Sequence, residues 1–229
     1  MVYSRISPLL SHHLAQCLLC GDRASESGIC PGCVGDLPYL GRACESCALP
    51  LASSARQCPN CLRQPPRFQR VQAAWQYAYP VSQLIQRFKY QGDLSAGHSL
   101  AQLAAGAIKP CGEPPDLLAP IPLHWRRYWI RGYNQAQLVA AELGRQWRLP
   151  VRPRLLRKIS ATRTQSQLRR QQRMRNLLQS FALRGSVQEM HIGLVDDVLT
   201  TGATLEAAAQ KLLEAGARKV SAFVLARTP

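Results

Sequence analysis

Acidic residues are scarce in this chain of 229 residues. It has 13 Asp and Glu against 29 Lys and Arg, which leaves a formal net charge of +16 at pH 7. An excess of this size favours polyanionic partners, such as nucleic acid or a phosphorylated ligand. A well-solvated basic surface is the alternative, and charge alone does not decide between the two.

Long apolar runs are also missing. No window approaches about 18 uninterrupted apolar residues, so the sequence predicts no membrane-spanning helix. Residues 1–20 lack the apolar core and the cleavage site of a signal peptide. We therefore expect a cytoplasmic protein, in which cysteines stay reduced.

A disulfide framework is disfavoured for the same reason, although the chain has nine cysteines. Eight of them form four Cys-x-x-Cys pairs: Cys17/Cys20, Cys30/Cys33, Cys44/Cys47 and Cys58/Cys61. Each pair can bind a metal through two thiolates, and two pairs complete a tetrahedral Zn²⁺ site. A thioredoxin-like redox motif would explain one such pair but not four. We expect the ninth cysteine, Cys111, to be incidental.

The spacing of the pairs suggests how they combine. Nine residues separate Cys20 from Cys30, and ten separate Cys47 from Cys58. These near-equal gaps indicate two consecutive zinc ribbons, although an interleaved pairing stays open. A module this small cannot bury enough apolar surface to fold alone, so two structural Zn²⁺ ions would supply its folding energy.

The rest of the chain follows another pattern. From about residue 70, strand-like apolar runs alternate with helix-like segments, which indicates a parallel α/β sheet flanked by helices. A Pro-rich, basic connector separates this part from the cysteines. We predict a zinc-ribbon module over residues 1–66 and an α/β domain over residues 67–229.

One stretch combines a strand, two acids and a turn. The apolar run Ile192–Val195 is typical of a buried parallel strand. Asp196 and Asp197 follow it, in what we expect to be a loop. The small, hydroxyl-rich turn Thr200–Thr204 then leads into a helix that starts at Leu205.

This order of residues has a chemical use. A turn before a helix presents free N–H groups and the positive end of the helix dipole, which suit a phosphate. Gly202 lets the backbone approach a ligand closely. The two acids suit sugar hydroxyls or Mg²⁺. A ribose 5-phosphate fits the whole stretch; the alternative is an ordinary βα unit with a polar loop. A P-loop is excluded, because no Gly-x-x-x-x-Gly-Lys-Ser/Thr is present here.

A second stretch contains a stiff turn and arginines. Leu117–Ala119 ends a strand, and Pro120 and Pro122 then restrict the backbone. Arginines close to such a turn can hold a pyrophosphate. The predicted pyrophosphate loop consists of Ile121, Pro122, Leu123, Arg127 and Arg131. A surface turn with solvated arginines is the alternative.

A third stretch is strongly basic. Residues 161–181 include five arginines and no acid. The predicted mobile basic loop consists of Arg163, Ser166, Gln167, Arg169, Arg170, Arg173 and Arg175. Such a segment can close over a bound ligand or bind nucleic-acid backbone, and a solvated helix is the alternative.

The sequence Val195–Thr204, VDDVLTTGAT, resembles the signature with which type I phosphoribosyltransferases bind phosphoribosyl pyrophosphate (PRPP). The resemblance implies that Asp196 and Asp197 hold the ribose hydroxyls and that Mg²⁺ accompanies PRPP. It assigns the 5-phosphate to the turn Thr200, Thr201, Gly202, Ala203 and Thr204. Ala203 stands where many of these enzymes have a second glycine.

The chain as a whole is similar to the ComF family (ComFC- and GntX-like proteins). The similarity rests on the four cysteine pairs, Phe88–Tyr90 with Gly92–Asp93, Pro120–Pro122, Arg131–Gln135, Thr164–Gln167 with Arg173 and Asn176, and Val195–Thr204. It implies a double zinc ribbon followed by a type I phosphoribosyltransferase-like domain.

The resemblance also implies functions and partners. The expected function is PRPP binding linked to DNA uptake in natural transformation, or to the handling of single-stranded DNA. Partners would then include single-stranded DNA and DNA-uptake or helicase proteins. One alternative is an active phosphoribosyltransferase that releases pyrophosphate, and another is a zinc-ribbon interaction module on a ligand-free scaffold. No feature of the sequence names an acceptor base or a catalytic residue.

Overall fold

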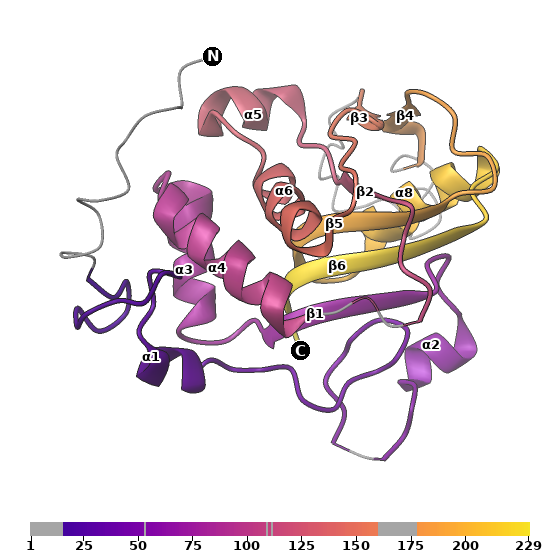
Figure 1. The fold of residues 1–229 in the computed structure, drawn as a ribbon. Coiled ribbons are helices and arrows are strands. Elements are labelled where there is room, and N and C mark those ends of the chain that lie inside the picture. Colours follow the sequence, from indigo (N-terminus) through magenta and orange to yellow (C-terminus); the bar gives the residue numbers. More distant parts are fainter. Residues whose placement is uncertain (1–15, 53, 109, 111, 160–177) are drawn as a thin grey trace, which may run out of the picture.

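A computed structural model describes residues 16–52, 54–108, 110, 112–159 and 178–229. A parallel sheet of four strands lies at its centre (Figure 1). The strand order is β1-β6-β5-β2. The strands are β1 (Arg70–Gln76), β2 (Leu117–Pro120), β5 (His191–Leu199) and β6 (Lys219–Arg227).

Both faces of the sheet are covered. One face carries the helices α3 (Val81–Tyr90), α4 (Leu94–Ala107) and α6 (Gln135–Trp147). The other carries α8 (Ala203–Glu214) and an antiparallel pair of short strands, β3 (Leu156–Lys158) and β4 (Phe181–Leu183).

Side chains alternate between the two faces, as they must on a strand. Val195 and Phe223 join the core beneath α3, α4 and α6, whereas Leu194 and Val224 join the core beneath α8. The predicted α/β fold class is therefore confirmed.

Local sequence explains where several helices begin and end. Asn134 caps α6 by accepting the N–H of Ala136 at 3.1 Å, as side chains of this kind do. Asp93 caps α4 by accepting the N–H of Ala96 at 2.9 Å. Gly216, with φ +92°, ends the turn after α8.

Two expectations about the second half of the chain were wrong. β5 continues to Leu199, so Asp196 and Asp197 lie within the strand and not on a loop. The pairing of β5 with β6 extends to Arg227, and this ladder keeps the acids extended. The arginine-rich stretch after β2 forms a helix, α5 (Trp125–Arg131), which we did not predict.

The cysteine-rich part packs along the outer edge of β1. It contains two short helices, α1 (Pro31–Gly35) and α2 (Pro59–Arg63). The N–H of Leu40 donates to Ala74 O at 3.2 Å, and the N–H of Gln76 donates to Pro38 O at 2.8 Å. A short antiparallel segment thus covers the free edge of the sheet (Figure 1).

None of the helices in the described ranges is long and apolar enough to cross a membrane.

Candidate functional site

The cysteines form two separate clusters of four. One consists of Cys17, Cys20, Cys30 and Cys33, and the other of Cys44, Cys47, Cys58 and Cys61. Within each cluster all sulfur atoms lie within 4.8 Å of one another. The consecutive pairing that we predicted is therefore confirmed, and the interleaved alternative is excluded.

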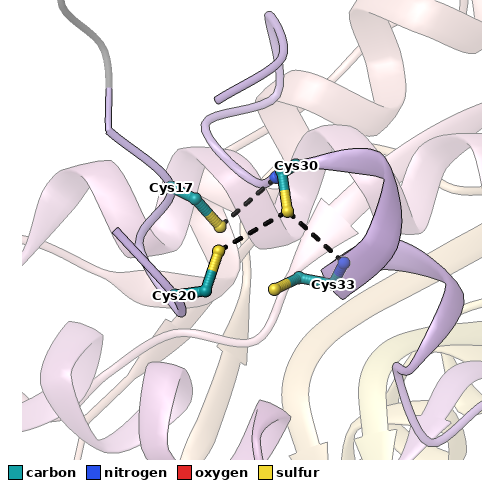
Figure 2. Close-up of side chains that lie close together, drawn as sticks. All are labelled: Cys17, Cys20, Cys30 and Cys33. Carbon is teal, nitrogen blue, oxygen red and sulfur yellow. Dashed lines mark hydrogen bonds between the residues drawn. The ribbon is translucent and has the colours of Figure 1, made fainter. Parts of the chain in front are cut away.

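The sulfur positions fit a tetrahedral metal site. Cys20 Sγ and Cys30 Sγ are 3.6 Å apart (Figure 2), and Cys47 Sγ and Cys58 Sγ are 3.7 Å apart. Zn–S bonds of about 2.3 Å place the sulfurs of a tetrahedral site roughly 3.8 Å apart. Both clusters thus match Zn²⁺, which would tie each pair of knuckles together and stabilise the fold around them.

Backbone N–H groups support the thiolates. The N–H of Cys30 donates to Cys17 Sγ at 3.3 Å, and the N–H of Cys58 donates to Cys44 Sγ at 3.3 Å. Such bonds favour the charged form of sulfur that binds metal. The same knuckle geometry recurs in both clusters, as expected for a repeat.

The acid pair lies in the carboxyl half of β5, and each acid has a distinct environment. Asp197 is 9% exposed and forms an ion pair of 2.9 Å with Lys89 of α3. Asp196 is half-buried on the same strand. Its burial, and then the neighbouring Asp197 carboxylate, raise the pKa of Asp196 from 3.8 to about 7. One acid therefore forms an ion pair with a lysine, while the raised pKa of the other favours its protonated form near neutral pH.

Lys158 of β3 also lies near this pair. Burial, and then the charge of Arg127, lower its pKa, while the Asp196 carboxylate raises it. The site thus has a lysine from α3 beside Asp197 and a lysine from β3 near Asp196. The predicted site residues include neither of these lysines.

The turn after β5 leads directly into α8. Gly202, with φ +79°, precedes the first helical residue, and no side chain of the described residues caps this helix. The N–H of Ala203 reaches Thr201 Oγ1 only at 3.5 Å. Among the described residues, the N–H groups of Thr204 and Leu205 have no hydrogen-bond partner. The amino end of α8 therefore keeps free donors for an anion.

The proline-containing loop lies next to the acid pair. The N–H of Ile121 donates to Val195 O at 2.8 Å, one residue before Asp196. Asn134 Nδ2 donates to Ile121 O at 3.0 Å and anchors the loop from α6. Two stretches that are far apart in sequence thus meet at the carboxyl edge of the sheet, where α/β folds place their ligands.

The two arginines of the predicted loop lie on α5. The guanidinium of Arg131 is 5.3 Å from the centre of the Tyr90 ring, next to Lys89 on α3. Arg131 Nη1 also donates to Gln135 Oε1 at 3.2 Å. Arg127 is exposed and close enough to Lys158 to affect its pKa. Arg127 thus lies near Lys158 and Arg131 near Tyr90, and among the described residues neither arginine forms an ion pair with an acid.

α5 presents an unusual exposed surface, which we call the α5 face. It consists of Trp125, Tyr128, Trp129 and Ile130, which are 57%, 49%, 81% and 85% exposed. Arg126 stacks on Trp125, with 5.3 Å between the guanidinium carbon and the ring centre. Large apolar side chains that are exposed together mark an interaction surface.

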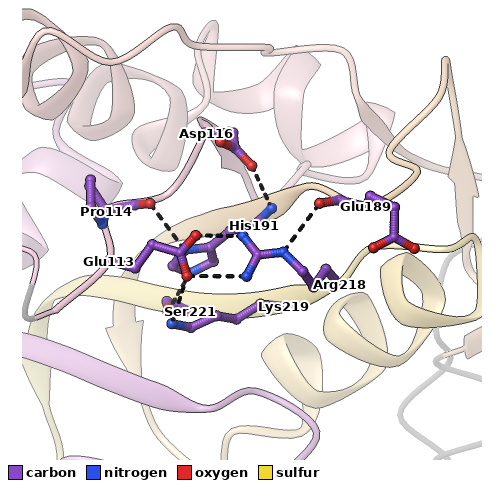
Figure 3. Close-up of polar contacts among 8 residues, drawn as sticks. All are labelled: Glu113, Pro114, Asp116, Glu189, His191, Arg218, Lys219 and Ser221. Carbon is purple, nitrogen blue, oxygen red and sulfur yellow. Dashed lines mark hydrogen bonds and ion pairs between the residues drawn. The ribbon is translucent and has the colours of Figure 1, made fainter.

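A cavity of about 400 Å³ lies at the opposite, amino edge of the strands. His191 is buried there, between Ser221 Oγ at 2.8 Å and Pro114 O at 3.2 Å (Figure 3). Glu113 nearby is paired with Arg218 and Lys219. The cavity contains none of the predicted site residues, so we place the candidate site at the carboxyl edge.

Some predicted residues lie outside the described part of the chain. They are Cys111 and the whole predicted basic loop, Arg163, Ser166, Gln167, Arg169, Arg170, Arg173 and Arg175.

Comparisons with known proteins agree with this arrangement. Residues 13–62 match the double zinc ribbon domain, and residues 131–229 match the phosphoribosyl transferase domain. Competence protein F of Haemophilus influenzae is 34% identical over 214 residues, which cover 89% of this chain and 92% of that protein. The chain belongs to the ComF family.

Other members of the ComF family cover a similar share of the chain. DNA utilization protein YhgH of Escherichia coli is 35% identical over 206 residues, which cover 88% of this chain and 91% of that protein. Competence protein ComFC of Bacillus subtilis is 29% identical over 238 residues, which cover 94% and 96%. The family therefore extends over the cysteine clusters and the sheet together.

Proposed function

We propose that this ComF protein binds PRPP at the carboxyl edge of its sheet. The observation that carries the proposal is the order of groups along β5 and α8: two carboxylates, then an uncapped helix end with free N–H groups. The proline-containing loop bonded to Val195 adds the third part of such a site. In this assignment Asp196 and Asp197 accept the ribose hydroxyls, and the turn Thr200–Thr204 holds the 5-phosphate.

The pyrophosphate would lie over the loop that begins at Ile121. Four basic side chains would surround this position: Lys89, Arg127, Arg131 and Lys158. Among the described residues, only Lys89 of these four is paired with an acid. Their charge offsets the several negative charges of PRPP. Mg²⁺ would bridge ligand oxygens more than protein oxygens, because it keeps several waters and prefers phosphate partners.

Calorimetric titration with PRPP and Mg²⁺ tests this site. Asp196→Asn combined with Asp197→Asn removes two carboxyl acceptors, and a single hydrogen bond to a charged group is worth roughly 1.5–3 kcal/mol, so PRPP affinity should fall by at least about tenfold. Zinc content should stay unchanged in the double variant. Equal affinity in the parent and the double variant would refute the assignment. No binding by either protein would favour a ligand-free scaffold.

We also propose that the protein acts in DNA uptake or in the handling of single-stranded DNA, as the names of its relatives suggest for those proteins. The α5 face supports a single-stranded partner, because exposed Trp and Tyr rings can stack on bases and Arg126 can contact backbone phosphates. The basic loop Arg163–Arg175 would add further phosphate contacts.

A single-stranded oligonucleotide of mixed sequence tests this partner. Binding should weaken steeply as salt is raised, because phosphate contacts release counterions. Changing Arg169, Arg170, Arg173 and Arg175 to Ala should weaken binding and flatten its salt dependence. Affinity that is insensitive to salt would argue against a backbone-binding surface.

An active phosphoribosyltransferase is the second candidate, and the environment of Asp196 favours it. A carboxyl with a pKa near 7 can accept a proton from an acceptor nucleophile at physiological pH. The reaction would join the nucleophile to ribose C1′ and release pyrophosphate. Screening nucleobases and amines for PRPP-dependent pyrophosphate release tests this candidate, and release that persists in Asp196→Asn would exclude Asp196 as the base.

A further inference from the structure

Arg227 joins the second cysteine cluster to the end of β5. It is the last residue of β6 and is only 8% exposed. Its Nε donates to the backbone oxygen of Cys47 at 3.1 Å, and its Nη1 donates to the backbone oxygen of Leu199 at 3.2 Å. Leu199 directly precedes the turn Thr200–Thr204. One buried guanidinium thus spans from a metal-binding knuckle to the start of this turn.

The other side of the turn is attached to the connector that follows the second ribbon. Glu206, in the first turn of α8, accepts the N–H of Arg67 at both carboxylate oxygens, at 2.9 and 3.1 Å. Arg67 follows closely after α2, the helix that contains Cys61. The residues before and after the turn are therefore bonded to Cys47 of the second ribbon and to the connector directly after this ribbon.

Apolar packing strengthens this connection. Ala48, which follows Cys47, is 2% exposed, and Phe68, which follows Arg67, is 4% exposed. Both belong to the same buried cluster as Leu199 and Leu205. Ala48 of the second ribbon and Phe68 of the connector thus share one core with the residues on both sides of the turn.

The first ribbon is connected differently. Its contact with the α/β part includes a hydrogen bond of 3.1 Å from Arg87 Nη1 on α3 to Leu18 O. Within the described ranges, no hydrogen bond links residues 16–37 to residues 199–206. The two ribbons have similar metal clusters, but only the second is attached to this turn.

We propose that the second zinc ribbon positions the phosphate turn, with Arg227 and Glu206 as the positioning residues. The inference rests on the proposed PRPP site. The turn has no side-chain cap of its own in the described residues, so its shape depends on its attachments. A turn held in place before the ligand arrives loses less freedom on binding and therefore binds more tightly.

Two substitutions test the positioning role. Arg227→Met keeps much of the side-chain volume but removes the donors, and Glu206→Ala removes the acceptor of Arg67. Arg218→Met is the matched control, because Arg218 lies near the start of β6 and pairs with Glu113 at the opposite edge (Figure 3). PRPP and inorganic pyrophosphate are titrated into each protein by calorimetry.

Each ligand reports on a different part of the site. Arg227→Met and Glu206→Ala should each lower the affinity for PRPP by about tenfold, a change of about 1.4 kcal/mol in binding free energy. Pyrophosphate, which occupies the loop at Ile121 and not the turn, should keep its affinity in both variants. The control should leave both ligands unchanged. Unchanged PRPP affinity in both variants, or an equal loss for both ligands, would overturn the inference.

A measurement on the unaltered protein covers the case in which Arg227→Met fails to fold. Binding is reciprocal, so if the second ribbon strengthens PRPP binding, PRPP must strengthen the ribbon's hold on its metal. We expect saturating PRPP to raise the affinity for one of the two Zn²⁺ ions in an equilibrium competition with a chelator. Equal Zn²⁺ affinities with and without PRPP would refute the coupling. If the unaltered protein does not bind PRPP at all, the proposed function fails as well, which is a distinct result.

Discussion

Replacing Asp196 by Asn should stabilise the fold and weaken PRPP binding at the same time. Burial and the Asp197 carboxylate raise the pKa of Asp196 from 3.8 to about 7, so the folded protein resists ionising this group. At about 1.4 kcal/mol per pKa unit, this difference lowers the free energy of unfolding by at most about 4 kcal/mol at pH 8. Because Asp196 is only half-buried and solvent screens part of the effect, we expect Asn to recover about 1–2 kcal/mol.

The sign of the pH dependence follows from the same pKa. Between pH 4 and 7 the folded state holds a proton on Asp196 that the unfolded chain has lost. The contribution of this group to stability is therefore largest below about pH 4 and is lost as the pH rises to about 7. Thermal unfolding of the parent and of Asp196→Asn should diverge over this range, by roughly 3–6 °C at pH 8.

Asp197→Asn is the matched control, with the opposite sign. It removes the partner of Lys89, whose side chain is 19% exposed, and leaves a mostly buried ammonium unpaired. We expect the free energy of unfolding to fall by about 1–3 kcal/mol at pH 8. The reasoning would be refuted if Asp196→Asn were destabilising at pH 8, or if both single variants shifted the unfolding temperature in the same direction.

Three further predictions test other parts of the molecule. Elemental analysis of protein purified without added metal should find about two equivalents of Zn²⁺, and a metal-free protein that stays folded would contradict this. Lys89→Met should lower the affinity for PRPP by about tenfold in calorimetry, because it removes both a positive charge and the partner of Asp197. Unchanged affinity would show that Lys89 is outside the site. Trp129→Ala should weaken the binding of single-stranded DNA by roughly 1–3 kcal/mol in a fluorescence titration, while the affinity for PRPP stays the same. Equal DNA affinity in the parent and the variant would exclude stacking on this ring.

Much of the fold could be predicted because its signals are local. The Cys-x-x-Cys spacing brings two thiolates to one metal within a single turn, so the sequence shows each knuckle directly. Helix α6 likewise has its apolar period and its Asn134 cap within one short stretch. The turn before α8 is likewise contained in a few residues.

The features that could not be predicted depend on contacts between distant segments. Lys89 does not belong to the apolar period of its helix, so the sequence pattern assigns it to solvent. Only the fold brings Lys89 of α3 to Asp197 of β5. Asp196 and Asp197 end an apolar run, so the pattern indicates a loop, but pairing with β6 keeps them in the strand. α5 has no buried residue in the structure, so its apolar side chains do not follow the one-sided pattern by which a buried helix is recognised.

Arg227 illustrates the limit most clearly. Near the end of the chain it resembles an ordinary terminal arginine, and its partners Cys47 and Leu199 contribute backbone oxygens, which carry no sequence signal. A role of this kind becomes visible only when the strand order is known.

The segment that covers β1 has a consequence for how the protein can be divided. The boundary near residue 66 separates two sequence patterns, but Pro38 and Leu40 complete the hydrogen bonding of the sheet that begins beyond it. A fragment that starts at residue 67 would carry an open strand edge next to Trp75, which is fully buried in the intact chain. Such a fragment should self-associate rather than behave as a separate enzyme domain. We therefore expect the two parts to fold together and not as independent modules.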